Sequence, residues 1–137
     1  MAPPRVIRLS RAPGDDELMS AVETWVADLV LGDYSAAISR TDHDPYYGWT
    51  ADLLRRVVEG YGLPEAHPRG PFRVTDPLDA SGRKRAAVDR EAVPPGAIAV
   101  VEYDLPLNGE WSDLTATFRV ELRGDAACLV LEEVHVF

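Results

Sequence analysis

Two short turn sequences near the C-terminus constrain this chain more than any other feature. Asn108-Gly109 is a strong hairpin signal, because a type I′ turn needs a positive φ angle at both central residues. Gly124-Asp125 has glycine at the first central position, as a type II′ turn prefers. Together they predict that residues 97–137 form a three-stranded antiparallel meander. Both hairpins, counted independently, place Phe118 on the same face, so we expect its ring in the core.

The turns also predict which residues pair across the strands. Counting back from the first turn places Tyr103 opposite Leu114, and counting from the second places Phe118 opposite Leu131. This face of the meander would line a pocket between the sheet and the helices. The predicted pocket-lining residues are Trp25, Val101, Leu114, Ala116, Phe118 and Leu131.

The first half of the chain has the apolar spacing of amphipathic helices, first over residues 15–31 and again over 50–61. Asp15 is expected to be the N-cap of the first helix, and Gly32 to follow its end in the C′ position. Asp33 and Thr50 are expected to cap a short second helix and a third one. Gly62 would end the third helix.

Length and composition indicate one globular domain over residues 15–137, preceded by a flexible basic segment over 1–14. The net charge of −9 argues against nucleic-acid binding and leaves two interpretations, simple solubility or attraction of a basic partner. The chain contains no apolar run long enough to cross a membrane. The single cysteine, Cys128, allows no internal disulfide and fits a reducing compartment. We therefore expect a cytoplasmic protein, and its preference for arginine over lysine suggests a bacterial one.

Helices that precede an antiparallel meander predict the α+β class, with the N-terminal helices packed on one face of a curved antiparallel sheet. Residues 63–96 hold six of the eleven prolines and are expected to be rich in loops, with short strands at 72–75 and 86–89. The order of elements resembles the nuclear-transport-factor-2-like superfamily (the ketosteroid-isomerase-like α+β cone). The resemblance rests on Leu31-Gly32-Asp33-Tyr34, the helix at 50–61 and the terminal meander. It implies a concave pocket, used by the enzymes of the superfamily for proton transfer, and frequent dimerisation.

The last strand provides the first candidate site. Strict alternation beyond Leu131 would point Glu133 and His135 inward, toward Tyr103. Burial would raise the pKa of Glu133 and suit it to move a proton. His135 would orient Glu133 or relay the proton onward, and the hydroxyl of Tyr103 would donate a hydrogen bond to a developing oxyanion.

A β-bulge at Glu132-Glu133 is the alternative, and the energetics favour it. The bulge would turn Val134 inward and leave Glu133 and His135 facing solvent. Burying an unpaired glutamate costs several kcal/mol, whereas a buried valine contributes about 1.5–3 kcal/mol. An unbroken strand would instead expose valines on the outer face of the sheet, and a homodimer through that face would cover them.

A second candidate site is a polar and aromatic stretch between the second and third helices. A carboxylate pair around an imidazole could bind a divalent metal or exchange protons. Neighbouring side chains in an extended segment point in alternate directions, however, so a turn without a metal is favoured. The residues concerned are Asp42, His43, Asp44, Tyr46, Tyr47 and Trp49.

Two functions remain open from the sequence. The favoured one is a non-catalytic binding module for a basic protein partner or a small apolar ligand, with an immunity or accessory protein as one form of it. The alternative is a cofactor-free acid–base enzyme of the isomerase, dehydratase or cyclase type that uses Glu133, His135 and Tyr103. No motif in the chain indicates a cofactor.

Overall fold

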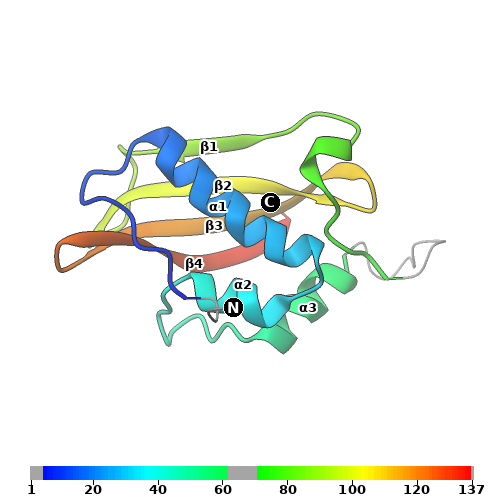
Figure 1. Cartoon of the computed structure of the whole chain (residues 1–137), viewed down its shortest axis with the longest axis horizontal. Helices are drawn as coiled ribbons and strands as arrows, with labels where there is room; N and C mark the ends of the chain where they lie inside the picture. Colours follow the sequence, from blue (N-terminus) through cyan, green and yellow to red (C-terminus); the bar gives the residue numbers. More distant parts are fainter. Residues whose placement is uncertain (1–4, 62–70, 137) are drawn as a thin grey trace.

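The computed structural model describes residues 5–61 and 71–136 and confirms the α+β class. In the described part, α1 (Asp15–Val30), α2 (Tyr34–Arg40) and α3 (Ala51–Glu59) come first. After the 3-10 helix η1 (Pro77–Asp79) come four strands, β1 (Ala86–Asp89), β2 (Ala97–Leu107), β3 (Glu110–Arg123) and β4 (Ala126–Val136). They form one antiparallel sheet in the order β1-β2-β3-β4. Helix α1 runs diagonally across one face of it, and α2 and α3 lie beside β4 (Figure 1).

Two of the three predicted helix caps are confirmed. The side chain of Asp33 accepts a hydrogen bond from the N–H of Ala36, and that of Thr50 accepts one from the N–H of Leu53. Helix α1 differs, because its N-cap is Gly14 and no side chain caps it. Asp15 is therefore the first helical residue, where the helix dipole favours its negative charge.

The predicted helix ends are also partly confirmed. Gly32 follows the C-cap of α1 with a φ of 74°, in the left-handed region that glycine adopts readily. Helix α3 ends at Glu59, and Gly60 is its C-cap, earlier than expected. The predicted stop at Gly62 lies outside the described residues.

Both predicted hairpins are present. Asn108 and Gly109 have φ angles of 49° and 85°, as a type I′ turn requires. Gly124 has a φ of 68° at the first position of the second turn. The second hairpin keeps its predicted register as far as the pair Phe118–Leu131.

The register of the first hairpin is corrected by two residues. Tyr103 lies opposite Ala116, not Leu114, because Ser112, Asp113 and Leu114 of β3 oppose Leu105 alone. The Ser112 hydroxyl stabilises this bulge by donating to the Leu105 carbonyl at 2.7 Å. A shift of two residues leaves every side chain on its predicted face, so Phe118 remains in the core.

The second bulge decides the orientation of the last strand. Phe118 pairs with Leu131 and Thr117 with Glu133, which leaves Glu132 as the extra residue of β4. Val134 therefore takes the inward position and is only 7% exposed. Glu133 and His135 are exposed on the other face, so the inward placement predicted by an unbroken strand is wrong.

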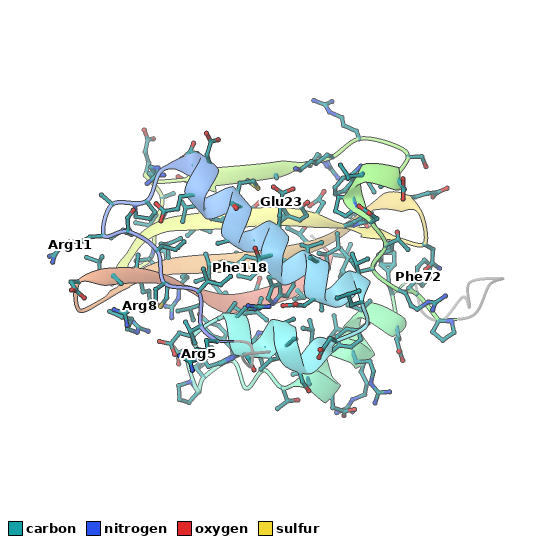
Figure 2. The ribbon with its side chains drawn as sticks, viewed as in Figure 1. Arg5, Arg8, Arg11, Glu23, Phe72 and Phe118 are labelled. Carbon is teal, nitrogen blue, oxygen red and sulfur yellow. The ribbon has the colours of Figure 1, made fainter. Side chains whose placement is uncertain are left out.

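The space between α1 and the sheet is filled by the hydrophobic core. The rings of Trp25 on α1 and Phe118 on β3 meet edge to face, with centroids 5.0 Å apart, and Figure 2 shows Phe118 beneath α1. All the residues predicted to line a pocket are buried members of this core; they are Trp25, Val101, Leu114, Ala116, Phe118 and Leu131.

The two edges of the sheet differ in whether another segment pairs with them. Beside β4, Leu9 exchanges two backbone hydrogen bonds with Ala127, and the N–H of Asp42 donates to the carbonyl of Leu129. Part of the basic N-terminal segment thus lies against the sheet, on the side where Figure 2 labels Arg5 and Arg8. Beside β1, no further strand pairs among the described residues.

Candidate functional site on the outer sheet face

The sheet face opposite α1, called here the outer face, carries two neighbouring rows of mostly polar side chains. Residues paired across adjacent strands project to the same side of a sheet. The pairs therefore define one row made of Ala87, Glu102, Thr117 and Glu133. The next row consists of Arg85, Asp104, Thr115 and His135, with Arg85 joined to β2 through its carbonyl.

A cleft of about 460 Å³ opens over these rows. Residues 83–87, at the start of β1, form one wall. Side chains of β2 and β3 form the rest of the lining, namely Glu102, Asp104, Asp113 and Thr115. The cleft thus combines cationic groups on one side with carboxylates on the other.

Asp104 is the anchored carboxylate of the cleft. Its side chain is about 10% exposed, and its Oδ1 accepts a 2.7 Å hydrogen bond from the hydroxyl of Thr115. Its Oδ2 accepts a hydrogen bond from Nε of Arg85 at 3.1 Å. A cation and a hydroxyl are both bound to Asp104, and together they fix the position of its carboxylate in the cleft.

Three other carboxylates near the cleft are exposed. Glu102, Asp113 and Glu133 all lie at the surface, and Asp113 accepts a hydrogen bond from the hydroxyl of Tyr61. In the described part of the chain, no lysine or arginine forms an ion pair with Glu102 or Glu133. Thr117 lies between these two glutamates, and its buried hydroxyl has no hydrogen-bond partner among the described residues. The outer face therefore presents carboxylates that no lysine or arginine of residues 5–61 and 71–136 neutralises.

The predicted catalytic group does not assemble. Glu133 and His135 lie on the outer face, whereas Tyr103 is completely buried on the inner face beside Trp111. Burial raises the pKa of Tyr103 to about 12, so its hydroxyl stays protonated near neutral pH. The bulge at Glu132 separates the three side chains, because it reverses the facing of every later residue of β4.

Glu132, which the sequence indicated only as a bulge position and not as a site residue, directly precedes Glu133 on β4. Burial raises the pKa of its carboxyl, the nearby Arg119 lowers it, and Glu133 raises it further. Burial raises the pKa of the Tyr47 phenol, and the negative charge of Glu132 raises it further. Glu132 therefore links the end of the outer face to the loop at 42–49.

The carboxylates of that loop bind arginines of β3 instead of converging on one point. Asp42 accepts from Nε of Arg123 at 2.8 Å, and Asp44 forms an ion pair with Arg119 at 3.1 Å. The N–H of His43 donates to Asp42 and is the main cause of the lowered pKa of that carboxyl. No group of three or more metal-ligating side chains is found in the described part of the chain.

The aromatic residues of the loop are spread out in the same way. Tyr47 packs under the guanidinium of Arg119, 5.6 Å from its ring centroid, and Tyr46 is 85% exposed. The indole N–H of Trp49 donates to a β4 carbonyl, and Nε2 of His43 lies 2.8 Å from the carbonyl of Ile38. The stretch is a loop with a turn at 45–47, and these contacts fasten it to the sheet and to α2.

The loop and the bulge at Glu132 together bury two valines of the apolar patch on which the predicted outer-face homodimer rested. Val130 is completely buried where residue 42 runs alongside it, and Val134 faces the core. Val136 is 44% exposed, but Val130 and Val134 are buried and do not extend its exposed surface. The outer face is consequently polar rather than apolar.

Sequence reasoning did not find the residues that line the cleft, because β1 was not aligned with β2. One signal was available, since Glu102 and Asp104 alternate with core residues on β2, as Thr115 and Thr117 do on β3. Polar residues at matching outward positions of two adjacent strands indicate a shared polar surface.

Comparisons of the chain with protein-family models, with curated proteins and with solved structures found no match. Of the helices in the described residues, none combines the length and the apolar character needed to cross a membrane.

Proposed function

We propose that this chain is a non-catalytic interaction module whose outer face binds a basic segment of a partner protein. The observation that carries the proposal is the pair Glu102 and Glu133, exposed in one row on either side of Thr117, without an ion-pair partner in the described part of the chain. A cationic side chain placed over Thr117 would lie between both carboxylates. Such charge complementarity raises the rate of association and the specificity of an interface.

The cationic wall of the cleft is compatible with a basic partner because two of its charges are already neutralised. Arg85 binds Asp104, and Lys84 reaches the other side of the sheet, where its Nζ lies 3.6 Å from Glu23 of α1. The net charge of −9 adds a long-range attraction for basic proteins at low ionic strength.

The packing of the core favours this partner over a small apolar ligand. An apolar ligand needs an enclosed space lined by hydrophobic side chains. The residues predicted to line that space instead pack against each other, as Trp25 does against Phe118. The separation of Glu133 and His135 from Tyr103 likewise leaves the acid–base enzyme without the group of side chains it requires.

A titration of the isotope-labelled protein with a short lysine-rich peptide, followed by amide NMR, tests the proposal. The shifted amides should cluster at Glu102, Thr117 and Glu133. The double variant Glu102→Gln/Glu133→Gln should weaken binding by about tenfold, which corresponds to 1.4 kcal/mol. The matched control, Asp79→Asn/Asp125→Asn, removes two exposed carboxylates elsewhere and should change the affinity by less than about twofold.

Equal losses of affinity in both double variants would show diffuse attraction to an acidic protein and would contradict the proposal. A failure of the peptide to bind the wild-type chain at low salt would also contradict the proposal. Raising the ionic strength should weaken binding of the wild type more than binding of the Glu102→Gln/Glu133→Gln variant, because fewer charges remain to be screened in the variant.

A further inference from the structure

Strand β1 leaves one edge of the sheet open. It forms the outermost strand in Figure 1, and among the described residues only β2 pairs with it. Ala86, Ala87 and Asp89 are exposed and Val88 is half-buried. The opposite edge is covered by Leu9 and residue 42, so the protein protects one edge and leaves the other free.

The direction of the backbone groups on β1 follows from one hydrogen bond. The N–H of Asp104 donates to the carbonyl of Arg85, and these residues continue the register in which Ala86 pairs with Tyr103. In an antiparallel ladder, residues alternate between those bonded to the neighbour and those turned away from it. Ala87 and Asp89 are therefore bonded to β2, and Ala86 and Val88 direct their N–H and C=O groups to the open edge.

Among the antiparallel registers with a second copy, the one centred on Ala87 uses all of these free groups. If Ala87 faces Ala87 of the second copy across a twofold axis, Ala86 and Val88 of each copy exchange both backbone hydrogen bonds. The small side chain of Ala87 lets the two strands approach closely at the axis. The same register places Arg85 of each copy opposite Asp89 of the other, on the outer face.

Both charged groups are available for this contact. The guanidinium of Arg85 uses Nε for Asp104, and its side chain is 68% exposed. Asp89 accepts hydrogen bonds from the N–H groups of Glu91 and Ala92 through Oδ1 only, which leaves Oδ2 without a partner in the described part of the chain. The twofold axis would therefore produce two reciprocal ion pairs between opposite charges.

We propose that the chain forms a homodimer by antiparallel pairing of β1 with β1 of a second copy, centred on Ala87. The two sheets join into one continuous sheet, and the clefts of the two copies lie on the same side of it. This contact replaces the outer-face homodimer expected from the sequence, because two outer faces that both carry unneutralised Glu102 and Glu133 repel each other. A four-residue edge is a small interface, so the dimer dissociates on dilution.

Sedimentation velocity of the full chain over a roughly hundredfold range of concentration tests the proposal. The wild type should shift from monomer to dimer as the concentration rises. Ala87→Glu and Ala87→Lys each place two like charges on the axis and should weaken the dimer by at least about tenfold. A mixture of the two variants should restore it, because glutamate then faces lysine. Ala27→Glu, at an exposed alanine of α1, is the matched control and should behave as the wild type.

The restored association in the mixture also demonstrates that both variants are folded. A wild type that stays monomeric at every concentration overturns the proposal. A dimer that survives Ala87→Glu overturns it as well, since the copies would then meet through another surface. A mixture that stays monomeric, although each variant has the circular dichroism of the wild type, contradicts the register centred on Ala87.

Discussion

The indole N–H of Trp49 donates a 3.0 Å hydrogen bond to the carbonyl of Glu132, the one residue in this part of β4 without a partner on β3. The bulge frees this carbonyl from the strand ladder, and the loop at 42–49 supplies its donor. The free carbonyl at the bulge and the indole N–H of a loop far away in the sequence are therefore each other's hydrogen-bond partners.

Trp49→Phe should destabilise the protein by about 1 kcal/mol, because it keeps an aromatic ring and removes only the N–H donor. Urea unfolding measures the change, and hydrogen exchange should accelerate in the amides of the 42–49 loop. Tyr46→Phe is the control, since Tyr46 is exposed and should tolerate the change. An unchanged free energy of unfolding would mean that Arg119 and Arg123 hold the loop without the indole.

Thr115→Val and Thr117→Val should have opposite effects, although both threonines are buried on the outer face of β3. Thr115 donates to Asp104, and losing that donor to a buried carboxylate should cost about 1–3 kcal/mol. The hydroxyl of Thr117 has no partner in the described part of the chain, so its replacement by a methyl group should be neutral or stabilising. Chemical denaturation of the two variants side by side tests this, and equal losses of stability would contradict the assignment.

Phe118→Ala should destabilise the protein by about 3–5 kcal/mol, because it removes a fully buried ring that packs against Trp25. The near-ultraviolet circular dichroism of the folded variant should also change as the indole loses its neighbour. Val136→Ala, on an exposed side chain of β4, should cost less than about 0.5 kcal/mol. A loss below about 1 kcal/mol for Phe118→Ala would be incompatible with this core.

Tyr103 should make the protein less stable at alkaline pH. Burial raises its pKa from 10.0 to about 12, so the folded state holds the phenol proton more tightly than the unfolded state. The resulting stability is complete below pH 10 and is lost as the pH rises toward 12. Tyr103→Phe should flatten this loss, and it should be neutral or stabilising near pH 7 because the buried hydroxyl has no partner among the described residues. Unfolding followed at a series of alkaline pH values measures it, and an unchanged slope in the variant would assign the loss to other groups.

Much of the local structure was predictable from the sequence. The two turns and the caps at Asp33 and Thr50 each depend on a few consecutive residues, which meet the conformational demand on their own. The core position of Phe118 was also predictable, because the bulge in β3 shifts the register by two residues and preserves the face. The start of α1 was harder to predict from the sequence. Glu17 accepts hydrogen bonds from Ser10, across the predicted domain boundary, and Asp15 is not the cap of the helix.

The candidate site was predicted less well than the fold. The sequence favoured a surface position for Glu133 and His135 and kept an inner pocket as the alternative. The burial of Val134 in the core selects the surface position. Arg85 and Asp104 are nineteen residues apart in the chain, and only the pairing of β1 with β2 brings them together. The cleft therefore has no signature in any short stretch of sequence.

The turns, two of the helix caps, the α+β order and the face on which Phe118 lies all follow from short stretches of sequence. Turn preferences and the alternation of side chains along a strand depend on only a few neighbouring residues. They therefore hold whatever the rest of the fold is. The sequence favoured a bulge at Glu132-Glu133 without excluding an unbroken strand, and packing between distant segments established it. The same packing fills the inner space and leaves the carboxylates on the outer face. The reason is that a bulge is stable only if its freed carbonyl finds a donor and the next side chain finds a core. Trp49 and the packing around Val134 meet these two requirements from distant parts of the chain.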